Sequence, residues 1–348
     1  MKRVYSGIGG QAVIEGIMMK NGDAYATAVR KTDGEIAVGR ESYVNVGKRH
    51  PFLALPLVRG VVSFVESMAL GIKTLTYSAS FFEDDESQEP TGFEKWLMKT
   101  FGDKTNDIIM GAAMVFAVAI AVVIFMILPT LISNLLRRFI DNYYLMSLIE
   151  GFVRLGIFIL YILLISRMDD INRTFMYHGA EHKCINCVEL GLPLTVDNVM
   201  ASSKEHKRCG TSFLVIVMTI SIIFFMFIKV DNVWMRVLSR IVFIPVVAGI
   251  SYEFLRIAGR SESPLVNALS RPGMWMQGLT TKEPTADMCE VAIAATESVF
   301  DWKAFLRDNF GWEEPETEVP EAEPETDETE ATGSESEESG ASVKISDI

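Results

Sequence analysis

The sequence predicts a mainly α-helical fold, a polytopic membrane helix bundle with a small β element near its N-terminus. Of the 348 residues, 49% are hydrophobic, and the mean hydropathy of +0.24 is too high for a soluble domain with an acidic tail. A helix needs about 20 apolar residues to cross a bilayer core of roughly 30 Å, where its internal hydrogen bonds satisfy its backbone. About four transmembrane helices are therefore expected, in the segments 108–132, 145–166, 211–228 and 237–257.

Charged residues distinguish these four segments. The third has none, whereas the second contains Glu150 and Arg154, and the fourth contains Arg240, Glu253 and Arg256. Helical spacing lets each glutamate neutralise an arginine on its own helix. A buried helix of a soluble protein is the alternative for these two segments. The same charge pairs are the basis for a weaker hypothesis, that of a transporter.

The N-terminal region, residues 1–50, is expected to form a small cytoplasmic β-containing unit. Two short runs typical of strands, 24–30 and 35–38, flank the turn sequence Lys31-Thr32-Asp33-Gly34. This pattern predicts a hairpin at least.

Residues 51–90 are interpreted as an amphipathic helix followed by an acidic linker. The apolar stretch 52–82 is interrupted by Arg59, Glu66 and Lys73, which are seven residues apart and so share one helix face. We expect this helix to lie in the membrane interface or to insert partly. Covering the small sheet and spanning the membrane are the alternatives.

The remaining chain divides into a membrane bundle, a C-terminal region and an acidic tail. Residues 91–260 form the membrane bundle, with a cytoplasmic loop at 167–210. Residues 261–312 form a C-terminal cytoplasmic loop and a helix, which Thr285 caps and which runs to about residue 305. Proline and glycine residues between 259 and 284 predict loop there.

Residues 313–348 form a disordered acidic tail. They contain fourteen Asp or Glu residues and one Lys, so they account for the whole net charge of −13. Such a composition cannot bury enough apolar surface to fold. The tail is a solvated segment or, alternatively, a docking site for a basic partner. Because the body is neutral and has no basic patch interleaved with aromatic residues, nucleic acid is not an expected partner.

The orientation of the chain in the membrane is predicted from its N-terminus, the number of crossings and the charges of its loops. No signal peptide is recognised at the N-terminus, which predicts a cytoplasmic start. Four crossings return the C-terminus to the cytoplasm and place the loop 167–210, with its six Lys or Arg residues, on the same side. The lipid bilayer is the expected partner, together with membrane proteins as substrates or partners.

The loop 167–210 contains three of the four histidines. His178 and His182 lie four residues apart with Glu181 between them, and His206 precedes Cys209. On a helix over 172–189, both histidines and Glu189 share one face, and Glu181 flanks it. The cysteines of the Cys-x-x-Cys sequence at 184–187 then face the opposite side, which argues against a zinc knuckle.

Two histidines one helical turn apart often hold a divalent metal, with zinc as the first candidate. The order His-x-x-Glu-His is also that of the inverted zinc peptidases, in which the glutamate activates water. Glu181 is therefore the candidate general base, with His178 and His182 as metal ligands. Candidates for a further ligand are Glu253, Glu189, His206 and Cys209, and Glu253 is favoured because ionisable residues inside membrane helices are usually functional. Histidines that are hydrogen-bonded for structural reasons are the alternative.

Four motifs resemble the YqhQ-like family of bacterial multi-pass membrane proteins, which are catalogued as predicted metal-dependent enzymes. The motifs span roughly residues 5–285, and where the family pattern often has proline between the histidine and the arginine, this chain has Lys207. They are Gly9-Gly10-Gln11-Ala12-Val13-Ile14-Glu15-Gly16-Ile17-Met18-Met19, His178-Gly179-Ala180-Glu181-His182-Lys183, Arg208-Cys209-Gly210-Thr211-Ser212-Phe213 and Gln277-Gly278-Leu279-Thr280-Thr281-Lys282-Glu283-Pro284. The resemblance implies the bacterial cytoplasmic membrane as location.

Two functions from different classes compete. The first is a metal-dependent membrane enzyme, a hydrolase acting on a membrane protein or a lipid. The second is a membrane scaffold or assembly factor that binds partners through its bundle, its tail and its N-terminal sheet. The segment 10–19 supports the scaffold hypothesis, because Ile17, Met18 and Met19 would offer soft apolar contacts.

Overall fold

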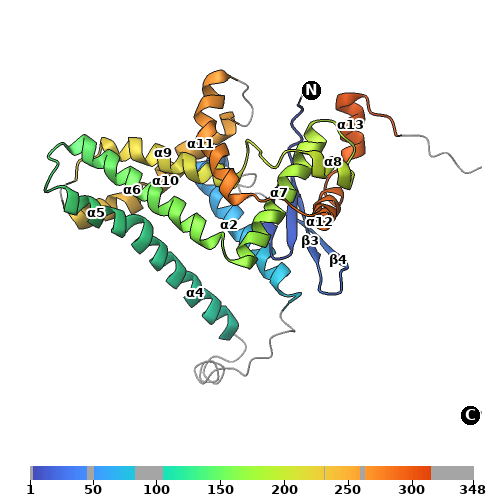
Figure 1. Cartoon of the computed structure of the whole chain (residues 1–348), viewed down its shortest axis with the longest axis horizontal. Helices are drawn as coiled ribbons and strands as arrows, with labels where there is room; N and C mark the ends of the chain where they lie inside the picture. Colours follow the sequence, from blue (N-terminus) through green and yellow to red (C-terminus); the bar gives the residue numbers. More distant parts are fainter. Residues whose placement is uncertain (1–2, 45–50, 83–104, 231, 259–262, 315–348) are drawn as a thin grey trace, which may run out of the picture. The chain divides into compact units, whose positions relative to one another are not determined.

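The computed structural model of the chain describes residues 3–44, 51–82, 105–230, 232–258 and 263–314 (Figure 1). It confirms the predicted fold class, a mainly helical chain with candidate membrane spans and a small N-terminal sheet. The chain separates into the units Met1–Trp312 and Glu313–Ile348. The predicted disorder of the acidic tail falls outside the described residues, apart from the first two of its positions.

The N-terminal sheet has four antiparallel strands in the order β1-β2-β3-β4, a meander in which each strand pairs with the next along the chain. The predicted hairpin is present as β3 and β4, with Gly34 at a φ of +88° in its turn. Two further strands precede it. The bounds are β1 Gly9–Val13, β2 Gly16–Asn21, β3 Ala24–Arg30 and β4 Ile36–Ser42.

Both faces of β2 are covered, which explains why its sequence does not alternate between polar and apolar residues. Ile17 and Met19 belong to the main core cluster, which is formed with helices α7 (Asp169–Glu189) and α12 (Ala286–Glu297). Met18 points the other way and packs against Leu70 of helix α2 (Val58–Ala79). The residues that the scaffold hypothesis needs on the surface are therefore buried, and that interpretation of segment 10–19 is wrong.

The predicted helix after residue 50 is α2, which contacts β1, β3 and helix α10 (Val233–Ala258). Gly60 permits the contact with α10, because a Cβ there would lie 2.8 Å from Cβ of Tyr252. The sequence left three arrangements open for this segment: a helix at the membrane interface, a helix that covers the sheet, and a membrane span. The contacts of α2 with β1 and β3 agree with a helix that covers the sheet.

Among the residues that the structure describes, three helices are long and apolar enough to cross a membrane: Ile109–Leu136, Tyr143–Ile165 and Trp234–Ala258. The first combines α4 (Thr105–Val122), the π-helical turn η4 (Val123–Ile127) and α5 (Leu128–Leu136). The second is α6 (Tyr143–Ile165) and the third lies in α10. The remaining predicted span, 211–228, is the shorter apolar helix α9 (Gly210–Met226), which packs against α6, α10 and α11.

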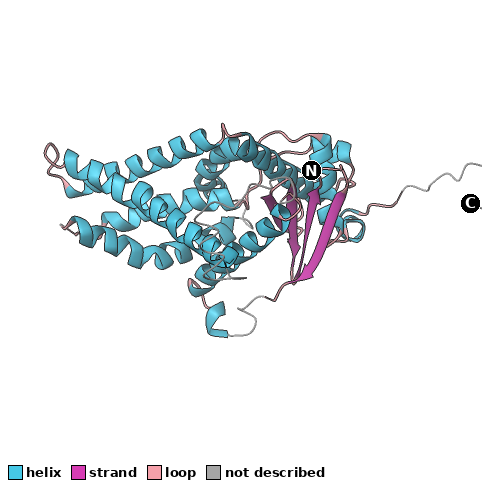
Figure 2. Ribbon diagram, turned by 90° about the horizontal axis from the view of Figure 1, so that it is seen from below, coloured by secondary structure: helices cyan, strands magenta, loops and turns pink. Residues whose placement is uncertain are grey.

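The hydroxyl of Tyr143 donates a hydrogen bond to the carbonyl of Ile228. The loop before α6 and the loop after α9 therefore meet at one end of the bundle, while the sheet lies toward the other end (Figure 2).

The segment 259–284, predicted to be loop, contains helix α11 (Pro264–Thr280) instead. Pro264 stands at the first helical position, where proline is tolerated, and Gly273 allows close packing on α9, with its Cβ position 2.9 Å from Cβ of Ser212. The helix predicted from Thr285 to about residue 305 is also interrupted. It divides into α12 and α13 (Trp302–Phe310), because the Asp301 side chain accepts a hydrogen bond from the Ala304 N–H and starts a new helix.

The charged residues of the apolar helices pair between helices, which corrects the expectation of pairing along one helix. Glu150 accepts a hydrogen bond from Arg240, and Glu253 accepts one from Nε of Arg59 at 2.6 Å. These bonds tie α6 to α10 and α10 to α2.

Candidate metal centre

Helix α7 carries the two histidines and closely matches the predicted helix. It begins with Asp169 and Asp170, whose negative charges suit the first turn, and it ends before Gly191 at a φ of +79°. The thiols of Cys184 and Cys187 are buried in the core cluster with α12, and Cys184 Sγ lies 3.1 Å from Thr296 Oγ1. The cysteine pair thus faces away from the histidines, as the helical spacing predicted.

Three side chains with metal-binding atoms meet at one point. One such atom from each of His178, His182 and Cys209 lies within 4.8 Å of the others. Cys209 is the N-cap of α9, and its Sγ lies 3.2 Å from Nε2 of His178. Two histidines one turn apart on α7 and the N-cap residue of α9 therefore assemble a cluster of two nitrogens and one sulfur.

Backbone carbonyls orient both imidazole rings. Nδ1 of His178 lies 3.0 Å from the carbonyl oxygen of Thr280, and Nδ1 of His182 lies 2.7 Å from that of Lys204. A carbonyl can only accept, so each Nδ1 donates its hydrogen and each Nε2 keeps its lone pair. Metal-binding histidines are typically held in this way, by an outer partner that fixes the tautomer and the direction of the ring.

Glu181 lies beside the cluster, with its Oε2 3.9 Å from Nε2 of His178. Burial raises the pKa of the Glu181 carboxyl, although the charge of His178 and a hydrogen bond from the Gly10 backbone oppose the rise. Gly10 of β1 approaches very closely, because a Cβ there would lie 2.8 Å from Cγ of Glu181. The sheet thus contributes a backbone donor to the site through a glycine that no larger residue could replace.

The cluster lines a cavity of about 430 Å³ that is also bordered by Glu181, His206 and the glycine-rich segment before β1. A second cavity of about 570 Å³ lies between α2, α9 and α10 and is mostly apolar. The two cavities share Gln11, Ser67 and Gly210 as lining residues. An apolar groove therefore adjoins the cavity that the histidines line.

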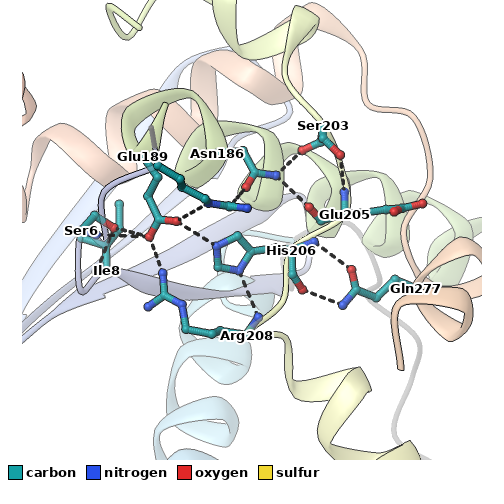
Figure 3. A network of polar contacts seen from close by, with 10 residues as sticks. Ser6, Ile8, Asn186, Glu189, Ser203, Glu205, His206, Arg208 and Gln277 are labelled. Atoms are coloured by element: carbon teal, nitrogen blue, oxygen red, sulfur yellow. Dashed lines mark hydrogen bonds and ion pairs between the residues drawn. The ribbon is translucent and has the colours of Figure 1, made fainter. Parts of the chain in front are cut away.

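His206 lies next to this cluster but serves a different network (Figure 3). Its Nδ1 accepts from the backbone N–H of Arg208 at 3.4 Å, so its Nε2 donates to Glu189 at 3.4 Å. Burial lowers the pKa of His206 to about 4, even though Glu189 opposes this effect, and the ring is neutral at pH 7. Both ring nitrogens are engaged, which separates His206 from the three clustered ligands.

Glu189 is the centre of that network. Its carboxylate accepts from Nε of Arg3 at 3.0 Å and from Oγ of Ser6 at 3.0 Å, besides His206 and Arg208. Burial alone would raise its pKa, yet the hydrogen bond with His206 and the charge of Arg208 hold the pKa at about 2. The network therefore anchors the N-terminal segment and the loop before Cys209 to the end of α7.

Gln277 and Asn186 complete the support of this loop. The Gln277 side chain accepts from the His206 N–H at 2.9 Å and donates to the His206 carbonyl at 2.7 Å. Asn186 donates to the carbonyl of Glu205 at 2.9 Å. Asn186 also donates to the carbonyl of Ser203 at 2.5 Å, so the backbone is fixed on both sides of Lys204, whose carbonyl orients His182.

Glu189→Gln is expected to destabilise the fold in a way that depends on pH. The folded pKa of about 2 lies below the ordinary 4.5, so the carboxylate stabilises the protein above pH 4.5 and loses this effect as the pH falls toward 2. A shift of this size corresponds to about 3 kcal/mol. Melting curves of both proteins between pH 7 and pH 3 measure it, and the difference between them should shrink as the pH falls. A difference that stays constant over this range would contradict the account.

Of the seven residues proposed from the sequence, the structure brings together His178, Glu181, His182 and Cys209, whereas Glu189 is bound by His206, Arg3 and Arg208. His206 is adjacent, with both ring nitrogens occupied. Glu253 is not part of the site, because its carboxylate is bound by Arg59 and it does not line the cavity. Sequence analysis missed the roles of Gly10, Gln277 and the Thr280 carbonyl, although all three positions lie in the motifs that carried the family resemblance.

Fold and site together define a helical protein with candidate membrane spans and a histidine–cysteine cluster at the end of its bundle. The chain belongs to the family described as "Protein of unknown function (DUF1385)", whose model matches residues 55–302. It is similar to the "Uncharacterized protein YqhQ" of Bacillus subtilis strain 168, at 34% identity over 302 residues, which cover 86% of this chain and 94% of that protein. No solved structure matches the chain.

Proposed function

We propose that the protein is a metal-dependent hydrolase whose centre is formed by Nε2 of His178, Nε2 of His182 and Sγ of Cys209. The observation that carries the proposal is the convergence of these atoms within 4.8 Å, with both imidazoles already oriented by carbonyls. Two nitrogens and a thiolate suit zinc, and three protein ligands leave a position open, as in catalytic zinc sites. A bound divalent metal would supply a Lewis acid that makes water acidic enough to attack near neutral pH.

Glu181 would act as the general base. Its carboxyl lies at the edge of the cluster, and burial raises its pKa, which makes the carboxylate a stronger base than one in water. The proton taken from water would pass through Glu181 to the leaving group as the substrate bond breaks. Gly10 would hold the carboxylate in position through its backbone N–H.

The substrate would be a membrane protein or a lipid. The apolar groove shares lining residues with the cavity at the cluster, so an apolar part of the substrate in the groove brings an adjoining ester or peptide bond to His178 and Glu181. Hydrolysis of such a bond adds the oxygen of water to one product and a proton to the other.

Glu181→Gln is expected to abolish hydrolysis but to keep the metal. The glutamine cannot accept a proton, while the three ligands stay in place. The purified, zinc-loaded wild type and variant are incubated with lipids and proteins extracted from the membrane of the source cells, in water enriched in ¹⁸O. Mass spectrometry should find ¹⁸O in a product of the wild type only, and equal incorporation in both samples would disprove the proposal.

The proposed topology puts this centre at the cytoplasmic face of the bacterial cytoplasmic membrane, with α6, α9, α10 and the helix Ile109–Leu136 crossing the bilayer. Ala201→Cys and Asp141→Cys test it, because both residues are exposed and lie at opposite ends of the bundle. A membrane-impermeant thiol reagent added to intact cells should label position 141 and not position 201. Labelling at position 201 would overturn the orientation.

A further inference from the structure

Inside the bundle, three arginines surround one glutamate. Glu150 accepts hydrogen bonds from Arg240 and, at 2.7 Å, from Oγ1 of Thr130, and its other oxygen lies 3.9 Å from Nη1 of Arg236. Arg154 lies one helical turn after Glu150 on α6. The four ionisable side chains thus carry three positive charges and one negative charge, in largely apolar stretches of α6 and α10.

The two guanidinium groups of Arg154 and Arg240 keep unused donors. Nε and Nη2 of Arg154 and Nε of Arg240 are buried and have no hydrogen-bond partner among the residues that the structure describes. A buried cation without a partner is strongly unfavourable, and inside a membrane protein such residues usually mark a functional site. These donors point to a missing anion.

Both arginines line a third cavity, of about 220 Å³, between η4, α6, α9 and α10. Its remaining wall is formed mainly by aromatic and aliphatic side chains, among them Phe125, Met218 and Val247. Phe64, Phe213 and Leu214 line both this cavity and the apolar groove of about 570 Å³. The cavity is therefore cationic at one point and apolar elsewhere, and it adjoins a groove with room for a long apolar chain.

We propose that this cavity binds a single-chain amphiphile through its carboxylate, as in a fatty acid. The carboxylate accepts hydrogen bonds from the unused donors of Arg154 and Arg240, a geometry that suits a guanidinium fork. The chain lies along α9 in the apolar groove. A glycerophosphate headgroup fits less well, because its esters and hydroxyls would be buried against walls that offer Ser221 as the other polar side chain.

This site is independent of the proposed hydrolase, because no metal ligand contributes to it. Its test is the thermal stability of the full chain in detergent with sodium oleate, oleyl alcohol or inorganic phosphate. Oleate is expected to raise the melting temperature by at least about 4 °C, and the other two compounds are not. If oleate and oleyl alcohol raised the melting temperature equally, the proposed role of the arginines would be wrong. If phosphate raised it as much as oleate, the proposal that the ligand is an amphiphile would be wrong.

Arg154→Gln is expected to abolish the oleate shift, whereas Arg167→Gln, in the exposed turn that follows the same helix, should keep it. An unchanged shift in Arg154→Gln would contradict the site. A second measurement does not depend on the variant folding. A fatty acid with a diazirine on its chain should crosslink, in the wild type, to the part of α9 between Phe213 and Phe225. Adducts confined to other helices would overturn the proposal.

Discussion

His182→Ala is expected to weaken zinc binding by at least about 100-fold. Structural zinc sites with four ligands bind with roughly 10–16 kcal/mol, so one ligand contributes on the order of 3 kcal/mol, and each tenfold change in affinity is about 1.4 kcal/mol. The variant should fold, because an alanine on α7 keeps the helix, and the losses are one hydrogen bond to the Lys204 carbonyl and the packing on the rings of His178 and His206. Competition with a chromophoric chelator measures the change.

Glu253→Gln is the matched control for this experiment. The sequence favoured Glu253 as a metal ligand, whereas the structure pairs its carboxylate with Arg59. The variant should therefore bind zinc as tightly as the wild type. A loss of affinity equal to that of His182→Ala would mean that Glu253 belongs to the metal centre after all.

Gly179→Ala is expected to destabilise the fold by about 3 kcal/mol or more, the upper range for overpacking a tight contact. A Cβ at this position would lie 2.0 Å from the carbonyl oxygen of Lys282, which is backbone and cannot move alone. The Lys282 N–H is itself bound to the Phe175 carbonyl at 2.9 Å. Because Thr280 is part of the same segment, the substitution should also loosen His178. A fall of the melting temperature by roughly 6–10 °C is expected.

Gly278→Ala provides the comparison. No atom lies within 4 Å of its Cβ position, and it stands on helix α11 near the same contact. Alanine there should leave stability unchanged or raise it by up to about 1 kcal/mol, because it favours the helix more than glycine does. If both variants lost stability equally, the close contact at Gly179 would not be the cause.

The sequence predicted much of the fold because its signals are local. The signals for helix ends predicted α7, and the helical spacing of its residues put His178 and His182 on one face. The apolar composition of the other segments predicted the apolar helices. The sequence does not predict α11, because Pro264 and Pro272 are typical of loops. In the structure the first stands at a helix start, and the second lies within a helix that packs on α9. A proline is a weak guide when tertiary packing stabilises the helix around it.

The site was predictable in part for the same reason. Spacing along one helix assigned the histidines and Glu181, but the choice among further ligands required contacts between distant segments. Glu253 pairs with Arg59, a residue 194 positions away, and no local pattern reveals such a partner. Cys209 reaches His178 because the loop before α9 is bound to Glu189 and Gln277, and this too depends on the tertiary fold.

The central claim is that His178, His182 and Cys209 form a metal site. Its most direct test is the metal content of the wild-type protein, purified from its membrane without chelators and measured by elemental mass spectrometry beside Cys209→Ser. We expect about one equivalent of zinc or another divalent transition metal per chain, and much less in the variant. Less than about a tenth of an equivalent in the wild type, unchanged after zinc is supplied and the excess removed, would contradict the account.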